Sequence, residues 1–310
     1  MATSVKNLPD REVVMPGNGA CAGCPATAAL RIVGKALGEN AIALMTPSCT
    51  VASIGLLPKS AFDFPIMNIT FASAGSSAAG MVYALEALEK KGKLRGEMPT
   101  VFNWIGDGGT YDIGMQAISA AAERNDNFIH ICYNNEAYSN TGVQRSGATP
   151  KYATTTTTPL GKLQNKKDMP RIMLEHGIPY LATASLAYPG DLYDKLVKAK
   201  NIKGFKYIEI FAPCCTGWKF APEELIKYSR LAVECGAWML YEAANGKISF
   251  QGTTKQLMEG VKSPKPLIDY LNGQGRFASL MNAENKDALI KELSEGIASG
   301  LHYMKKRAEI

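Results

Sequence analysis

Two segments decide the fold of this chain: TVFNWIGDGG at residues 100–109 and FIHICYNNEAYSNTG at residues 128–142. Each begins with a short apolar run rich in β-branched and aromatic residues, which predicts a strand. Between them, Ile113, Ala117 and Ala120 follow four- and three-residue spacings and indicate the apolar stripe of a helix. We therefore expect a strand, a helix and a second strand, the unit of a right-handed parallel crossover.

The ends of the two predicted strands carry residues suited to a diphosphate and a metal ion. Asp107 supplies a carboxylate just before the helix, and Asn135 supplies an amide oxygen 28 residues later. Gly106, Gly108 and Gly109 let backbone N–H groups approach phosphate oxygens. One carboxylate with neutral oxygens suits Mg²⁺ held mainly by a ligand's phosphates. An ordinary glycine turn is the alternative, but both halves together resemble the thiamine diphosphate motif.

The cysteines form a second pattern. Five of the seven lie in three motifs, CAGC with Cys21 and Cys24, PSCT with Cys49, and APCCTGW with Cys214 and Cys215. Four thiolates from such distant positions predict a tetrahedral sulfur site, for which a [4Fe-4S] cluster and a structural zinc are the main candidates. A redox pair and small buried hydrophobes are further alternatives. For Cys132 and Cys235, a buried inert thiol is expected.

Together, the two patterns resemble the β subunits of the 2-oxoacid:ferredoxin oxidoreductases, and among these the pyruvate type. The resemblance rests on GDG at 106–108, NEAYSNTG at 135–142, QRS at 144–146 and the cysteines, and it spans about residues 17–245. It implies an α/β fold, a parallel sheet with helices on both faces that binds thiamine diphosphate. It also implies an oxidoreductase subunit that decarboxylates a 2-oxoacid and passes electrons through a [4Fe-4S] cluster to ferredoxin.

The resemblance implies a role for each motif residue. The cluster ligands would be Cys21, Cys24, Cys49 and Cys214, with Cys215 as a bystander. The Mg²⁺ ligands would be Asp107, Asn135 and the backbone carbonyl of Ala137. The cofactor would be lined by Cys49, Gly106, Asp107, Gly108, Gly109, Asn135, Glu136, Ala137, Tyr138, Ser139, Asn140 and Thr141. Asn140 would face the reacting centre and is the expected catalytic residue.

The same resemblance implies a hetero-oligomer of anaerobic metabolism. An α subunit would supply the activating glutamate and the substrate clamp, and γ and ferredoxin-like δ subunits would pass electrons to an external ferredoxin. The chain is therefore expected to be inactive alone. Pyruvate, converted with coenzyme A to acetyl-CoA and CO₂, is the expected substrate.

Two departures from the family pattern leave the substrate open. Relatives commonly carry Gly-Glu after the second cysteine, where this chain has Pro25 and Ala26, and many have Asp in place of Asn134. The loss of two acidic groups beside the cofactor would ease the binding of a more highly charged acid. Oxalate, giving two CO₂ without coenzyme A, is therefore an alternative substrate.

Two other functions compete with this interpretation. The first is a zinc-stabilised, non-catalytic subunit with a vestigial crevice. The second is a non-oxidative thiamine decarboxylase or acetolactate-type synthase, which would share the metal motif but would not need four cysteines. Iron and sulfide in the purified protein, in place of zinc, would decide for the cluster.

Composition is consistent with a globular enzyme subunit. The chain has 310 residues, of which 46% are hydrophobic and 20% charged, and its formal charge of +6 comes from scattered basic residues. No basic stripe with interleaved aromatic residues is present, so nucleic acid is not an expected partner. A mild positive charge would suit an acidic ferredoxin. No signal peptide or membrane-spanning run is found, so a reducing cytoplasm is expected, which favours metal over disulfides.

The order of apolar patterns predicts two parts. Residues 1–245 form the thiamine diphosphate and cluster domain, and residues 246–310 form an extension, with a hairpin-like piece and a final helix, that packs on the domain or on a partner. A threonine run, Thr154–Thr158, is either a β-prone connector, which we favour, or a loop at the cofactor mouth. Strands are expected at 41–46, 65–71, 100–105, 128–133, 179–184, 206–211 and 238–243. Helices are expected at 25–37, 74–91, 113–124, 169–176, 191–200, 222–235 and 286–307.

Overall fold

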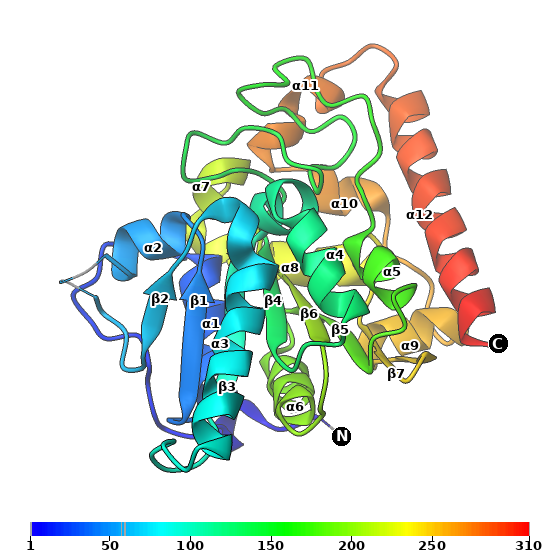
Figure 1. The fold of residues 1–310 in the computed structure, drawn as a ribbon. Coiled ribbons are helices and arrows are strands. Elements are labelled where there is room, and N and C mark those ends of the chain that lie inside the picture. Colours follow the sequence, from blue (N-terminus) through cyan, green and yellow to red (C-terminus); the bar gives the residue numbers. More distant parts are fainter. Residues whose placement is uncertain (1, 57, 59, 310) are drawn as a thin grey trace.

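A single mixed sheet forms the centre of the molecule. The structure is a computed structural model, and it describes residues 2–56, 58 and 60–309. Within these residues the strands are β1 (Ala41–Met45), β2 (Ile66–Asn68), β3 (Thr100–Gly106), β4 (Ile129–Asn134), β5 (Tyr180–Ser185), β6 (Lys206–Phe211), β7 (Tyr241–Ala244) and β8 (Lys247–Phe250). Their spatial order is β2-β1-β3-β4-β6-β5-β7-β8 (Figure 1). All pairings from β2 to β5 are parallel, which confirms the predicted α/β class.

Helices cover both faces of the sheet, as predicted. They are α1 (Pro25–Leu37), α2 (Cys49–Ile54), α3 (Ala74–Lys90), α4 (Met115–Glu123), α5 (Met169–Leu174), α6 (Pro189–Lys200), α7 (Cys215–Trp218), α8 (Leu225–Glu234), α9 (Gly252–Met258), α10 (Leu267–Leu271), α11 (Ala278–Met281) and α12 (Lys286–Ala308). One apolar core contains Leu30 of α1 and Leu196 of α6, and the other contains Ile118 of α4 and Met173 of α5. Successive residues of β3, such as Trp104 and Ile105, point into opposite cores, because side chains alternate between the two faces of a sheet.

Strand β7 differs from the predicted parallel arrangement, whereas β8 lies in the hairpin-like piece expected after position 245. The strand expected at 238–243 is β7, and it pairs antiparallel with β5 and with β8. The cause of the hairpin is the two-residue turn Asn245–Gly246, in which both residues have positive φ, 48° and 80°. Such turns join antiparallel strands directly. Residues after position 245 therefore continue the same sheet.

Helix α3 packs closely on α4. Its first half is rich in alanine and glycine, which lets the two backbones approach each other. A Cβ at Gly75 would lie 2.1 Å from the carbonyl oxygen of Ala117 in α4, so only glycine fits there. The contact holds α4 against the sheet, and α4 follows directly on the glycine-rich turn that ends β3.

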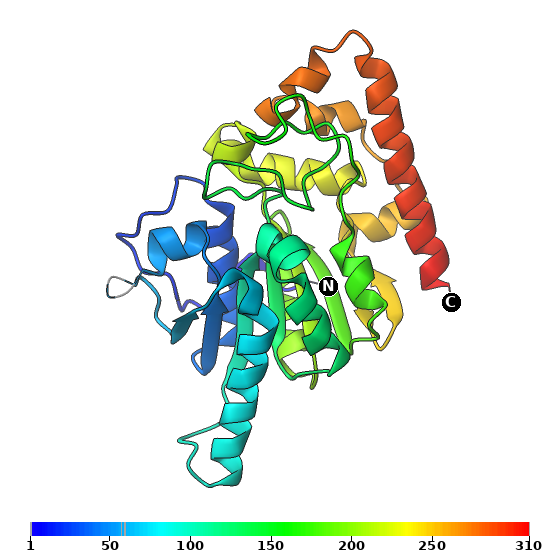
Figure 2. The same cartoon turned by 45° about the horizontal axis from the view of Figure 1, so that its top comes forward.

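The carboxyl ends of the parallel strands form the functional edge of the sheet. Figure 2 turns this edge toward the viewer, and α7, the long connection from β4 to α5, and the region of α10 and α11 gather above it. Helix α12 runs along the side of the molecule and packs against both apolar cores (Figure 1). No helix in the described ranges is both long and apolar enough to cross a membrane.

Candidate active site

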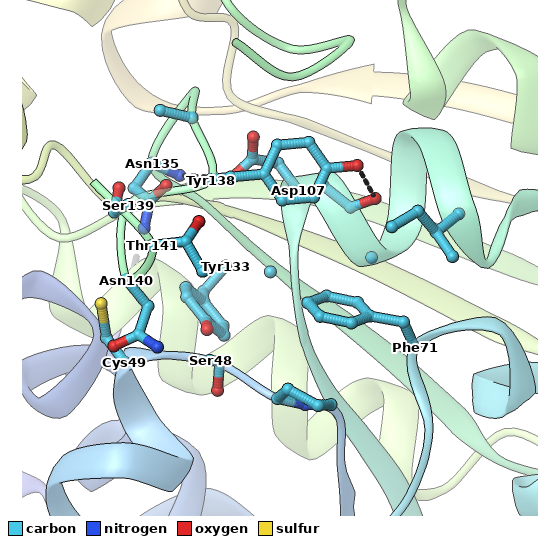
Figure 3. Close-up of a pocket in the computed structure, with 16 residues that line it drawn as sticks. Ser48, Cys49, Phe71, Asp107, Tyr133, Asn135, Tyr138, Ser139, Asn140 and Thr141 are labelled. Atoms are coloured by element: carbon cyan, nitrogen blue, oxygen red, sulfur yellow. Dashed lines mark hydrogen bonds between the residues drawn. The ribbon is translucent and has the colours of Figure 1, made fainter. Parts of the chain in front are cut away.

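A cavity of about 170 Å³ lies at the carboxyl ends of β3 and β4 (Figure 3). We call it the Asp107 cavity. It brings together every predicted cofactor-lining residue except Glu136: Cys49, Gly106, Asp107, Gly108, Gly109, Asn135, Ala137, Tyr138, Ser139, Asn140 and Thr141. Further lining residues, which sequence reasoning missed, are Pro47, Ser48, Phe71, Ile113 and Tyr133. They were missed because they border the motifs or come from a separate segment.

The floor of the Asp107 cavity is a π-helical turn, η3 (Gly108–Ile113), that opens at Asp107 and continues into α4. Such turns recur at functional sites. A Cβ at Gly108 would lie 2.2 Å from the ring of Tyr138, whose hydroxyl donates a 3.0 Å hydrogen bond to the Gly108 carbonyl (Figure 3). Glycine is therefore required at 108, because the aromatic ring lies directly across the turn.

Three predicted metal ligands converge in the Asp107 cavity. The amide oxygen of Asn135 lies 2.7 Å from the carbonyl oxygen of Ala137 and 3.0 Å from Asp107 Oδ1. Acceptor oxygens this close repel unless a proton or a cation lies among them. A rotated Asn135 amide would supply the proton, whereas Mg²⁺ would hold all three oxygens as they stand. The edges of an octahedron with 2.0–2.1 Å ligand distances are roughly 2.9 Å long, so the spacing fits Mg²⁺.

Asp107 is buried in a way that demands a partner for its charge. Its side chain is 1% exposed, and Ser146 Oγ donates a 2.5 Å hydrogen bond to Oδ2. Burial raises the pKa of Asp107 to about 8, and the Ser146 hydrogen bond opposes this shift only in part. A cation bound next to this carboxyl group would keep it ionised at neutral pH.

Glu136 and Asn134 do not face the cavity. Glu136 pairs with Arg276 at 2.7 Å, on the far side of the loop. Asn134 donates a 2.7 Å hydrogen bond to buried Glu209 and accepts one of 2.9 Å from the Glu136 N–H. An acidic residue at 134 would therefore meet the carboxylate of Glu209 and not the cofactor cavity, so Asn134 does not favour oxalate over pyruvate.

A second cavity, of about 270 Å³, adjoins the first, and we call it the cysteine cavity. Its walls include the four predicted cluster ligands, Cys21, Cys24, Cys49 and Cys214. Helix N-termini meet here, because Cys24 and Cys214 are the N-cap residues of α1 and α7 and Cys49 is the first residue of α2. The positive ends of helices favour thiolates over thiols.

The thiols of the cysteine cavity influence one another. Burial raises the pKa of Cys49 to about 11, and the next causes are the neighbouring Cys214, Cys24 and Cys21. All seven cysteines are free of disulfides. Within the described residues, no three His, Cys, Asp or Glu side chains are close enough to enclose one metal ion. The four thiols therefore line the walls of the cavity and do not meet at the position of a single ion.

Cys215 lines the cysteine cavity beside the four, but its thiol is engaged elsewhere. It donates to the carbonyl oxygen of Ala22 at 3.3 Å, inside the Cys21–Cys24 knuckle. Cys214, by contrast, accepts a hydrogen bond of 3.3 Å from the Gly217 N–H. Burial raises the pKa of Cys214, and the Gly217 N–H opposes this rise in part.

The two cavities share three lining residues: Cys49, Asn135 and Asn140. Cys49 and Asn140 lie together at one side of the Asp107 cavity (Figure 3). The threonine run contacts the residue that follows the cofactor loop 135–142. The Thr156 N–H donates a hydrogen bond of 3.0 Å to the Val143 carbonyl oxygen. Thr155 and Thr158 form an isolated antiparallel β-bridge around a turn at Thr156 and Thr157, and the run contains no full strand.

Comparison with known proteins gives three results. Residues 58–210 match a family model described as the thiamine pyrophosphate enzyme, C-terminal TPP binding domain. The pyruvate synthase subunit PorB of Methanothermobacter marburgensis is 42% identical over 299 residues, which cover 95% of this chain and 99% of that protein. The ketoisovalerate oxidoreductase subunit VorB of Pyrococcus horikoshii is 41% identical over 294 residues, covering 93% of this chain and 92% of the relative.

A solved structure shares the fold. It is the 2-oxoglutarate:ferredoxin oxidoreductase from Magnetococcus marinus, determined with 2-oxoglutarate, coenzyme A and succinyl-CoA bound. The TM-score is 0.59 at 19% sequence identity, and the match covers 93% of this chain and 98% of that one. At this identity the likeness concerns the fold alone.

Proposed function

We propose that this chain, which belongs to the family of β subunits of the 2-oxoacid:ferredoxin oxidoreductases, binds Mg²⁺ in the Asp107 cavity and a [4Fe-4S] cluster in the cysteine cavity. Family membership makes it a subunit of a thiamine diphosphate-dependent oxidoreductase that works with partner subunits. The observation that carries the proposal is the pair of adjoining cavities with shared walls.

The Asp107 cavity supports binding of the metal and the diphosphate. The Asn135 amide oxygen lies close to the Ala137 carbonyl oxygen and to Asp107 Oδ1, at distances near the edge length of an Mg²⁺ octahedron. The N–H groups of the turn that begins at Gly108 lie at the start of a helix, where phosphate binds favourably. When bound, thiamine diphosphate supplies the nucleophilic carbon and the electron sink for decarboxylation.

The cysteine cavity supports a cluster better than a single zinc. Zinc sites hold four ligands at about 2.3 Å from one point, whereas the four thiols here line a cavity of about 270 Å³. Cys49 belongs to both cavities, so a cluster bound there would lie beside the cofactor. Electrons released by the oxidation that accompanies decarboxylation would have a short path to the cluster and on to ferredoxin.

A partner subunit would complete the Asp107 cavity. Among its described lining residues, Asp107 is the one carboxylate, and it is committed to the metal. The glutamate that activates thiamine diphosphate would therefore come from an α subunit, along with the substrate clamp. Docking of γ and δ subunits and of ferredoxin belongs to the same proposal.

Pyruvate, with coenzyme A as the acyl acceptor, is the substrate that we propose. Its support is the 42% identity to a protein named as a pyruvate synthase subunit, although another relative of similar identity is named for ketoisovalerate. Oxalate now has weaker support, since Asn134 is engaged with Glu209.

The decisive experiment uses the purified complex with all subunits. Viologen reduction is measured with pyruvate, 2-ketoisovalerate and oxalate, each with and without coenzyme A, and iron, sulfide and zinc are determined on the same sample. Coenzyme A-dependent turnover of pyruvate, with iron and sulfide present, is the expected outcome. Turnover of oxalate but not of pyruvate would contradict the proposed substrate. Zinc without iron would contradict the proposed [4Fe-4S] cluster.

A further inference from the structure

The C-terminal segment inserts one charged side chain into the cofactor loop. Arg276, only 4% exposed, forms an ion pair of 2.7 Å with Glu136, which is 3% exposed. The two residues are 140 positions apart in the chain. No candidate site residue was predicted within residues 246–310, and the fold brings Arg276 from that segment to the cofactor loop.

Glu136 stands between two of the proposed Mg²⁺ ligands. Its backbone has φ of 60°, a left-handed conformation that is unfavourable for a residue with a side chain. Its N–H donates to Asn134 Oδ1 at 2.9 Å, and its carbonyl accepts from Thr149 Oγ1 at 2.6 Å. The peptide groups on either side of Glu136 determine where the Asn135 amide and the Ala137 carbonyl point.

Arg276 holds the same loop through a second route. Its guanidinium lies 3.2 Å from the centre of the Trp218 ring, and the Trp218 Nε1–H donates to the Asn135 carbonyl at 2.8 Å. Two other N–H groups donate to Gln274 at 2.8 Å and to the Tyr270 hydroxyl at 3.1 Å. Arg276 is therefore held by three hydrogen bonds and the Trp218 ring, and it supports the loop at Asn135 and at Glu136.

We propose that Arg276 is a positioning residue for the loop 135–137, and that it sets the affinity of the Asp107 cavity for Mg²⁺. The inference rests on the proposed Mg²⁺ site. By holding the Glu136 carboxylate, Arg276 keeps the strained backbone in place, and the two flanking oxygens stay aimed at the metal. Removal of such an outer partner typically weakens metal binding about 10- to 100-fold.

A matched control is available in α6. Lys195, 3% exposed, pairs with Asp191 at 2.6 Å, also inside the protein but in a helix that packs on α1 and β5. Loss of the Lys195 cation removes the ion-pair partner of Asp191, and loss of the Arg276 guanidinium leaves Glu136 with only the longer contact of 3.4 Å to Lys166 Nζ. Lys195→Met thus reproduces the loss of a buried charge without touching the loop.

The test is a Mg²⁺ titration of the metal-free complex at saturating thiamine diphosphate. Cofactor retained after rapid desalting is measured for wild type, Arg276→Met, Arg276→Lys and Lys195→Met. We expect Arg276→Met to require about 10- to 100-fold more Mg²⁺, with kcat largely recovered at saturating Mg²⁺. Arg276→Lys keeps the charge and should fall in between, and Lys195→Met should match wild type.

The outcomes separate this inference from the function on which it rests. If wild type retains no cofactor in response to Mg²⁺, the proposed metal site fails and the inference fails with it. If wild type responds but Arg276→Met titrates like wild type, or Lys195→Met weakens Mg²⁺ as much, only the role of Arg276 is overturned. Should Arg276→Met fail to assemble, Arg276→Lys decides: unchanged Mg²⁺ affinity counts against the role, and weaker affinity supports it.

Discussion

The two adjoining cavities are built in different ways. Most walls of the Asp107 cavity come from two short segments, residues 106–109 and 135–141, which one crossover brings together. The cysteine cavity takes its four thiols from positions 21, 24, 49 and 214, which are gathered by three helices. The first site is therefore a local motif of the chain, and the second exists only once the sheet is complete.

This difference has a mechanical consequence. The Asp107 cavity depends on the turn after β3 and on supports behind it, whereas the cysteine cavity depends on the packing of α1, α2 and α7. The shared residues, Cys49, Asn135 and Asn140, are where a change in one site is expected to reach the other. Single substitutions in one cavity test whether the other cavity keeps its ligand.

The largest effect is expected from Asp107→Ala. It removes the one carboxylate of the proposed metal site, so Mg²⁺-dependent retention of thiamine diphosphate should fall by at least about 100-fold, while iron and sulfide stay near wild type. Asp168→Ala is the control, since Asp168 caps α5 by accepting from the Arg171 N–H at 3.1 Å. Loss of iron from Asp107→Ala would show that the cavities are not independent.

Cys49→Ser should produce the converse result. Iron and sulfide are expected to fall and viologen reduction to be lost, because one of the four proposed ligands is gone. Cofactor retention should change much less, because serine keeps nearly the size of the side chain that also lines the Asp107 cavity. Cys235→Ala, at a buried thiol outside both cavities, serves as the control. Viologen reduction that survives Cys49→Ser would contradict the electron path proposed here.

Gly75→Ala should lower the stability of the fold by disturbing the contact of α3 with α4, the helix that continues from the turn at the Asp107 cavity. The added methyl group would meet the Ala117 carbonyl in α4, and overpacking against backbone should cost about 3 kcal/mol. Gly80→Ala in the same helix has open space and should stabilise by about 0.5–1 kcal/mol. Urea denaturation of both variants measures the difference, and equal stabilities would contradict the close contact of α3 and α4.

His130 makes the support beneath the Asp107 cavity sensitive to acid. Its ring nitrogens contact Thr110 Oγ1 at 3.1 Å and Asn103 Nδ2 at 3.2 Å, and Asn103 as donor assigns the ring proton to Nε2. Burial lowers the pKa of His130 to about 3. Because the folded pKa lies below the unfolded value of about 6.5, stability is complete above pH 6.5 and is lost as the pH falls.

The measurement compares urea denaturation at pH 7 and pH 5 for wild type and His130→Gln. About 2 kcal/mol should be lost by wild type between these values through His130 alone, since each pH unit below 6.5 costs about 1.4 kcal/mol. The variant should lack this part of the loss. An identical pH dependence in both proteins would show that His130 is not held neutral in the fold.

The sequence predicted the local parts of this protein well. Helix α1 spans the predicted residues 25–37, and β6 spans the predicted 206–211. Both follow from apolar periodicity between clear stop signals. The short helices α9 and α10 were missed, since their few turns carry little periodicity, and β7 was expected in a parallel sheet because its partner cannot be read from one strand.

By itself the sequence determined the parallel sheet, its two helical layers and the Asp107 loop, because these depend on spacing within short segments. Only the tertiary structure decided that Glu136 turns away from the cavity to meet Arg276, and that Asn134 is engaged with Glu209. It also decided that Cys215 holds the Cys21–Cys24 knuckle by its backbone. These contacts join distant positions, and their partners depend on strand order and on how the C-terminal segment packs over the strand ends.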